Sequence, residues 1–241
     1  MKIIKADNYE HMSMRAARIM ASQIALKNNS VIGLATGDTP LGMYREIIKM
    51  YKDKELDFSK VKTFNLDEYY GLNRDNENSY YFYMTNNFFK YINMRKENIN
   101  IPNGMTENIE AECSNYDKKI KASGGIDIQI LGIGVNGHIG FNEPNTSFEV
   151  GTHLVELEKE TIKSNSRFFD SPEEVPTKAI SMGIKTIMQS RAIILLASGE
   201  KKAVAIEKTI KGKISTAIPA SILQLHNNVI LIVDKAAGKF I

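Results

Sequence analysis

Five short apolar runs, rich in Val and Ile, recur along the chain and constrain its fold more than any other feature. They occupy residues 30–36, 60–66, 126–134, 191–198 and 227–233. Apolar runs of this length are typical of strands that are buried on both faces of a sheet. Amphipathic segments alternate with these runs and predict helices. The predicted helices cover residues 8–27, 41–53, 79–91, 108–123 and 201–211. This alternation indicates a doubly wound, Rossmann-like, mostly parallel sheet with helices on both faces.

A single three-layer α/β/α domain accommodates the whole chain. Its 241 residues, 43% of them hydrophobic, are enough to close one sizeable core. No internal repeat or linker marks a boundary, so we expect one domain over residues 1–241. Residues 144–185 differ from the rest because they are polar, show weak periodicity and contain two prolines in the stretch SPEEVP. This pattern predicts an active-site lid within the domain.

Charge and apolar content exclude several classes of protein. The 31 basic and 28 acidic residues are too evenly balanced to indicate nucleic-acid binding. No apolar run approaches the roughly 18 residues that a membrane-spanning helix needs, and the first ten residues lack the pattern of a signal peptide. The single cysteine, Cys113, cannot form an internal disulfide. We therefore expect a cytoplasmic protein that contacts no membrane and acts on a small anionic molecule.

The segment after the first apolar run is suited to binding an anion. Thr36, Gly37, Asp38 and Thr39 form a small polar turn, and Pro40 is expected at the first position of a helix. The free backbone N–H groups and the positive end of the helix dipole point at any ligand in such a turn, and Gly37 lets the backbone approach a phosphate. The alternative is a helix N-cap without a ligand.

Two carboxylates, Asp67 and Glu68, follow the second apolar run. Ligands of open parallel sheets bind beyond the carboxyl ends of the strands, so one of these residues is a candidate general base. A carboxylate that is partly shielded from water has a raised pKa and can take a proton from a carbon next to a carbonyl or iminium group. The alternative is an ordinary capped turn with solvated acids. Without further support, the presence of these two residues favours that alternative.

The third run leads into a glycine-rich loop, LGIGVNGHIGFNEP. Gly132, Gly134 and Gly137 match the GxGxxG pattern of dinucleotide sites. That fingerprint requires the third glycine to open a helix, whereas the following segment is extended or turning and ends in proline. We therefore exclude a nicotinamide-dependent dehydrogenase.

The same loop brings together Asn136, His138 and Glu143. A carboxylate can orient an imidazole that acts as acid or base near pH 7, and the three glycines give the loop unusual backbone freedom. A lone His is more often structural, but this crowding favours a catalytic role. A His/Glu metal site is disfavoured because the five-residue separation matches no common ligand spacing.

Two cations are candidate phosphate ligands. Lys202 lies in the first turn of a predicted helix, where an anion would relieve its repulsion with the helix dipole. Arg167, within the predicted lid, has a guanidinium that can bind phosphate oxygens in pairs. The alternative for both is a solvated basic surface.

Taken together, these segments resemble the glucosamine-6-phosphate deaminase family. The resemblance spans about residues 30–234 and is carried by six segments in the order and spacing of the family. They are ATGDTPLGMY, FNLDEYYGL, SYYFYM, NGHIGFNEP, NSRFF and SILQLH. The resemblance implies the α/β/α fold, no metal or organic cofactor, and the isomerising deamination of glucosamine 6-phosphate to fructose 6-phosphate and ammonia.

The resemblance also implies a role for each candidate residue. His138, held by Glu143 and Asn136, opens the pyranose ring, and Asp67 then moves a proton from C2 to C1 of the open-chain sugar. Glu68 is a neighbour that tunes Asp67. The turn from Thr36 to Thr39, together with Arg167 and Lys202, holds the 6-phosphate.

Two departures from the family's pattern limit what can be transferred. Many members have Asp where this chain has Asn136, so the group around His138 carries one fewer negative charge. The allosteric, hexameric members have cations shortly after the NEP motif, where this chain has His153 and Val155. We therefore expect a monomer or small homo-oligomer without activation by the acetylated sugar phosphate.

Two other functions fit parts of the pattern. A 6-phosphogluconolactonase would share the fold and the phosphate site but needs no base over C2, so LDEYYGL fits it poorly. A non-catalytic sugar-phosphate sensor would keep the phosphate site and lose the acid–base groups. The chain retains Asp67, His138 and Glu143 and shows no helix-turn-helix segment, which favours the enzyme.

Overall fold

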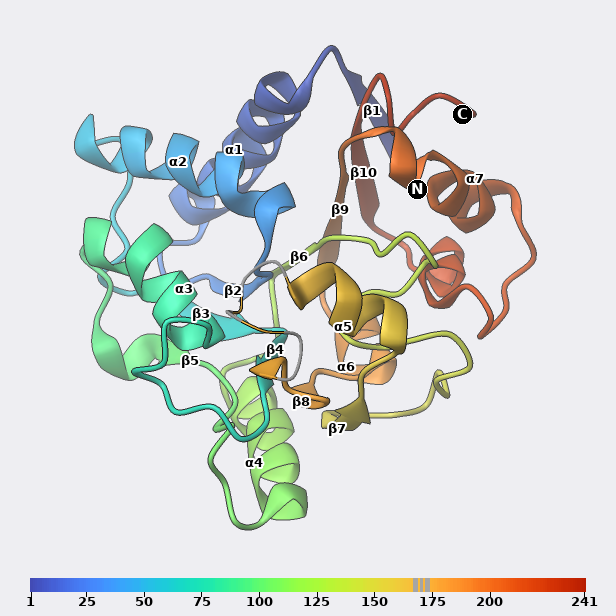
Figure 1. Ribbon diagram of the computed structural model, residues 1–241. Coiled ribbons are helices and arrows are strands. Elements are labelled where there is room, and N and C mark those ends of the chain that lie inside the picture. Colours follow the sequence, from blue (N-terminus) through green and yellow to red (C-terminus); the bar gives the residue numbers. More distant parts are fainter. Residues whose placement is uncertain (167–168, 170, 172–173) are drawn as a thin grey trace.

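A parallel sheet forms the centre of the molecule (Figure 1), and the computed structural model describes residues 1–166, 169, 171 and 174–241. The sheet has seven strands in the order β1-β10-β9-β6-β2-β3-β5, and all neighbours run parallel. The strands are β1 (Lys2–Ala6), β2 (Val31–Leu34), β3 (Lys62–Asn65), β5 (Ile99–Asn100), β6 (Ile128–Leu131), β9 (Ala192–Ala197) and β10 (Val229–Asp234). Each predicted apolar run contains one strand, which confirms the α/β fold class.

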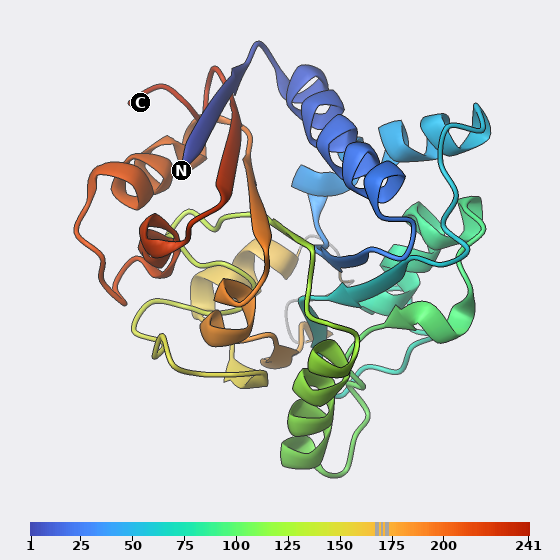
Figure 2. The same cartoon turned by 180° about the vertical axis from the view of Figure 1, so that it is seen from behind.

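Helices cover both faces of this sheet. They include α1 (Tyr9–Leu26), α2 (Asp38–Lys52), α3 (Tyr80–Asn87), α4 (Ile109–Ala122), α6 (Ile184–Met188) and α7 (Ala203–Lys211). Figures 1 and 2 show α1 and α2 on one side of β9 and β10 and α7 on the other. No described helix is long and apolar enough to cross a membrane.

The helix boundaries follow local sequence chemistry. In α1, the Asn8 side chain accepts the N–H of His11, and Met12, Ala16 and Met20 recur at four-residue spacing on the buried face. Two predicted helices divide in the structure. The segment 79–91 becomes α3 and a separate 3₁₀ turn, Phe89–Tyr91, and α7 is preceded by a 3₁₀ turn, Glu200–Lys202.

A second, antiparallel sheet lies beside the first and is not predicted by the apolar runs. Its order is β4 (Asp67–Tyr69), β8 (Lys178–Ser181) and β7 (His153–Glu156), and α5 (Lys159–Asn165) follows β7. Strands of three or four residues are too short to give a detectable period. The segment 144–185 therefore contains regular structure, and its role as a lid stays a prediction.

The strand order creates a crevice at the carboxyl ends of β2 and β6. From β2 the chain proceeds outward to β3 and β5, and it then returns to β6 on the other side of β2. The segments after β2 and β6 consequently diverge, which is the arrangement at which open α/β sheets bind ligands. The predicted anion turn follows β2, and the glycine-rich loop follows β6.

Candidate active site

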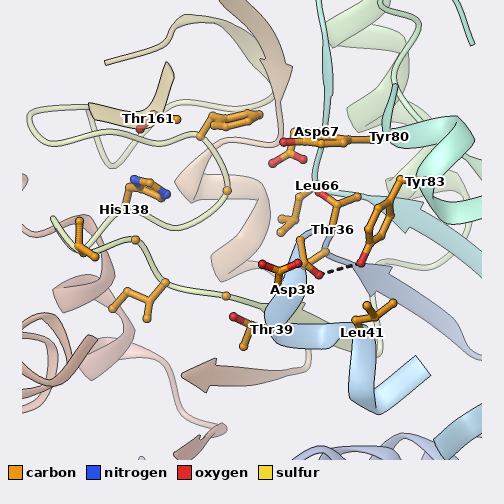
Figure 3. A pocket seen from close by; sticks show the side chains of 18 of the residues that line it. Thr36, Asp38, Thr39, Leu41, Leu66, Asp67, Tyr80, Tyr83, His138 and Thr161 are labelled. Atoms are coloured by element: carbon orange, nitrogen blue, oxygen red, sulfur yellow. Dashed lines mark hydrogen bonds between the residues drawn. The ribbon is translucent and has the colours of Figure 1, made fainter. Parts of the chain in front are cut away.

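A pocket of about 950 Å³ opens at this crevice (Figure 3). Its walls come from the segments that follow β2, β6 and β9, from β4, α2 and α3, and from one residue each of α1 and α5. The predicted site residues that line it are Thr36, Gly37, Asp38, Thr39, Asp67, Asn136, His138 and Lys202. Figure 3 shows Asp67 and His138 on different sides of the pocket, with Thr39 and Asp38 on a third.

Three predicted residues need separate comment. Glu143 does not line the pocket, but its carboxylate contacts Nδ1 of His138, which does. Arg167 lies outside the described residues. Lys202 lies half-buried at the end of the 3₁₀ turn that precedes α7, on the pocket wall. The structure thus brings together most of the residues that the sequence places at separate strand ends.

The anion turn has a geometry that differs in one detail from the prediction. Helix α2 starts at Asp38, so Pro40 is its third residue and not its first. The helix begins earlier because Gly37 adopts a φ of 93°, a conformation that favours glycine, and acts as the N-cap. A glycine cap has no side chain to satisfy the N–H groups of the first turn, which leaves them for a ligand.

Tyrosine hydroxyls fix the backbone of this turn. Tyr83 donates to the Gly37 carbonyl at 2.7 Å (dashed line in Figure 3), and Tyr9 donates to the Asp38 carbonyl at 2.7 Å. Tyr44 donates to the Ala35 carbonyl at 2.6 Å. Sequence reasoning misses these three residues, because only the packing of α1, α2 and α3 brings their hydroxyls to the turn.

We expect Tyr83→Phe to weaken phosphate binding without impairing the chemical step. Losing the bond to Gly37 frees the turn, so KM rises about three- to tenfold, while kcat stays within about twofold. Steady-state kinetics measure both. Tyr116→Phe is the matched control, since it removes a buried hydroxyl bond to the Asn65 carbonyl outside the pocket lining and lowers only the thermal midpoint. An unchanged KM in Tyr83→Phe would remove Tyr83 from the turn's support.

Asp67 is a buried carboxylate at the pocket wall, which overturns the alternative of solvated acids. Its side chain lies at the start of β4, and the residue is only 6% exposed. Burial raises the pKa of Asp67 to about 8, and the nearby charge of Glu68 adds to the rise. A carboxyl whose pKa lies near neutrality can both accept and return a proton under ordinary conditions.

Glu68 has a structural task beside Asp67. Its carboxylate accepts hydrogen bonds from the backbone N–H groups of Tyr69, Tyr80 and Tyr81 at 2.8 to 2.9 Å. It thereby anchors the start of α3 against β4. Burial raises the pKa of Glu68, and these backbone donors oppose that rise. Glu68 does not line the pocket.

His138 and Glu143 form a hydrogen-bonded pair on the other side of the pocket. His138 Nδ1 lies 3.2 Å from Glu143 Oε2, and the same oxygen accepts a bond of 2.9 Å from Asn136 Nδ2. Burial raises the pKa of Glu143, but the bonds from His138, Thr161 and Asn136 outweigh it and hold that pKa below its usual value. Because an ionised carboxylate only accepts, Nδ1 donates the hydrogen in this bond, and Nε2 is the ring nitrogen that Glu143 does not engage.

The His138 loop passes directly beside Asp67. A Cβ atom placed on Gly140 would lie 3.7 Å from Asp67 Oδ2. Gly140 has a φ of 57°, a conformation that favours glycine and that sets the path of the loop beside this carboxyl. The Asp67 carboxyl and the His138 imidazole therefore line the same pocket. Among the described residues, no group of three or more His, Cys, Asp or Glu side chains is arranged to hold a metal ion.

Acid–base groups on two sides of a pocket, with a turn suited to an anion between them, are typical of an enzyme that moves protons on an anionic substrate. Residues 5–232 match the family model of glucosamine-6-phosphate isomerases/6-phosphogluconolactonase. The chain therefore belongs to this family, and within it to the glucosamine-6-phosphate deaminases, as its similarity to individual members shows.

Three comparisons support this placement. A glucosamine-6-phosphate deaminase of Clostridium botulinum (strain Kyoto / Type A2) is 68% identical over 238 residues, which cover 99% of this chain and 98% of the relative. One from Clostridium acetobutylicum is 64% identical over 241 residues and covers all of both chains. A solved structure of a monomeric glucosamine-6-phosphate deaminase has 47% identity and a TM-score of 0.98, with both chains fully covered.

Proposed function

We propose that this chain converts glucosamine 6-phosphate and water into fructose 6-phosphate and ammonium by ring opening followed by proton transfer from C2 to C1. The observation that carries the proposal is the buried Asp67 carboxyl, which faces the same pocket as the His138–Glu143 pair. A 6-phosphogluconolactonase hydrolyses an ester without removing a proton from carbon, so it gains nothing from a base over C2.

The 6-phosphate binds at the start of α2. The first-turn N–H groups, the positive end of the helix dipole and Gly37 suit an anion there, and Lys202 lines the same pocket. Arg167 belongs to this part of the proposal on the strength of the family resemblance, and the lid over residues 144–185 on the strength of its sequence pattern. Holding the phosphate at a fixed point places the reacting carbons between His138 and Asp67.

Ring opening is the task of His138. Nε2 accepts the proton of the anomeric hydroxyl, and as the C1–O5 bond breaks the imidazolium returns a proton to O5. Glu143 stabilises the imidazolium through Nδ1–H. Asn136 keeps Glu143 aligned without adding a second negative charge.

Isomerisation is the task of Asp67. The ionised carboxylate takes the C2 proton, which the C1 carbonyl and the C2 ammonium acidify. One ammonium proton passes to O1 in the same step, so that an enolamine with a C1 hydroxyl forms. The carboxylic acid then returns a proton to C1, which leaves an iminium at C2. Water adds to that carbon, and ammonium departs to give fructose 6-phosphate. The bound ammonium favours the ionised form of Asp67, so a pKa raised in the free protein does not prevent its action as base.

The protein acts in the cytoplasm as a monomer. The 47% identical structure of a monomeric deaminase, covered over its full length, supports this oligomeric state. We propose no allosteric effector, because His153 and Val155 replace the cations of the allosteric members. Size-exclusion chromatography with light scattering checks the mass.

We expect the purified protein, after treatment with a chelator, to release ammonium and form fructose 6-phosphate in equal amounts from glucosamine 6-phosphate. Metal removal leaves the rate unchanged, because Asp67 and His138 carry out all the proton transfers. A coupled assay measures both products, with galactosamine 6-phosphate and 6-phosphogluconolactone as comparison substrates. Hydrolysis of the lactone without ammonium release, or binding without turnover, would overturn the proposal.

A further inference from the structure

Thr161 is a buried residue of α5 that reaches the His138–Glu143 pair, although sequence reasoning assigns it no role. It is 5% exposed, and its hydroxyl donates a hydrogen bond to Glu143 Oε1. The two carboxylate oxygens of Glu143 thus have separate partners. Oε2 serves His138 and Asn136, and Oε1 serves Thr161.

This arrangement fixes the rotation of the carboxylate. A carboxylate that is held only at Oε2 can turn about its Cγ–Cδ bond and change the direction in which it presents a lone pair to His138. The bond to Thr161 removes that freedom. Glu143 is itself 5% exposed, so water cannot readily replace a lost partner at Oε1.

The same residue connects the pair to the sheet that carries Asp67. Helix α5 follows β7, which pairs with β8, and β8 in turn pairs with β4. Ser181 of β8 lies opposite Asp67 in the register, and its hydroxyl accepts the N–H of Phe141 in the His138 loop at 3.1 Å. Two polar contacts, through Thr161 and Ser181, therefore join the His138 loop to the small sheet.

We propose that Thr161 is a positioning residue that holds Glu143 in the orientation His138 needs, and that it fixes this pair relative to the sheet that carries Asp67. The proposal rests on the ring-opening role proposed for His138. Thr161 acts through Glu143 and not on the phosphate, so its loss reduces kcat and leaves KM nearly unchanged.

The test compares Thr161→Val, which keeps the shape and removes the hydroxyl, with Thr161→Ser, which keeps the hydroxyl. Thr161→Val lowers kcat for glucosamine 6-phosphate about ten- to a hundredfold, because a hydrogen bond to a buried charged group is lost. Its KM stays within about twofold of wild type. Thr161→Ser retains kcat within about threefold.

Thr186→Val is the matched control. Thr186 is a buried threonine whose hydroxyl also donates to a carboxylate, Asp117, at 3.0 Å, but it does not line the pocket. We expect this variant to lower the thermal midpoint and to retain the wild-type kcat. The thermal midpoints of all variants are measured alongside, so that kinetics are compared only below unfolding.

Three outcomes would overturn the role of Thr161. They are a wild-type kcat in Thr161→Val, an equal loss in Thr161→Ser, and a loss of kcat in Thr186→Val as large as in Thr161→Val. Failure of the proposed function is distinguishable, because it leaves the wild-type protein itself unable to release ammonium from the substrate.

Discussion

Asp67→Asn abolishes nearly all ammonium release from glucosamine 6-phosphate, with kcat reduced about 10³-fold or more, because an amide cannot accept the C2 proton. KM changes little, since the phosphate turn is untouched. Steady-state kinetics with quantified enzyme measure both parameters. The pocket wall keeps its shape because Asn is nearly isosteric with Asp. A variant with more than about a tenth of the wild-type kcat would assign the base to another group.

The same substitution makes the protein more stable at neutral and higher pH. The folded pKa of Asp67 is about 8 against 3.8 for an ordinary aspartate, so between these values the folded state binds more protons than the unfolded state. Wild-type stability therefore falls as pH rises through this window, and Asn removes that dependence. We expect the thermal midpoint of Asp67→Asn to exceed that of wild type by on the order of 5 °C at pH 8, with the difference vanishing near pH 4.

Asp127→Asn provides the contrast. Asp127 is also buried, but it contacts Lys27 at 2.7 Å and Arg191 at 3.2 Å and accepts the N–H of Val31. Its neutralisation leaves two cations without their partner and lowers the thermal midpoint, while kcat of the folded enzyme stays unchanged. A stabilisation of Asp127→Asn equal to that of Asp67→Asn would show that the effect is not specific to the pocket.

His138→Asn has the second large effect, a loss of about 10²- to 10³-fold in kcat/KM. The Asn amide can take the place of Nδ1 and keep the bond to Glu143, but it offers no base at the position of Nε2. The variant then depends on the minor open-chain form of the sugar that arises in solution. Steady-state rates with glucosamine 6-phosphate give the loss, and partial rescue by added imidazole would identify the missing group.

His11→Gln is the control for this variant. His11 Nδ1 lies 3.2 Å from Asp7 Oδ2, the same separation as in the pair of His138 and Glu143, but on the surface away from the pocket. We expect wild-type kinetics from it. Activity in His138→Asn equal to that of His11→Gln would mean that the ring opens without His138.

The fold was largely predictable because its signals are local. The apolar runs, such as residues 191–198, indicate burial on both faces, and the spacing of Met12 and Met20 in α1 indicates one buried side. Edge strands and the small sheet give no such signal. β4 and β7 have three and four residues, and β4 pairs with β8, which lies more than a hundred residues later in the sequence.

The candidate site was predictable in its chemistry but not in its surroundings. Asp67, His138 and the anion turn follow strands, and the sequence places them at the edge where parallel strands end. Tyr83 and Thr161 come from helices, whose inward faces carry no mark of what they will contact. The contacts of Tyr83 and Thr161 are visible only in the tertiary structure.

The sequence by itself determined the alternation of helices and strands and which residues are candidates for the acid–base groups, because both depend on residue type and short-range spacing. Only the tertiary structure decided the crevice between β2 and β6, the burial that raises the pKa of Asp67, and the support of Glu143 by Thr161. Desolvation, charge interactions and hydrogen bonds depend on which distant segments lie together, and no local pattern in the chain encodes those distances.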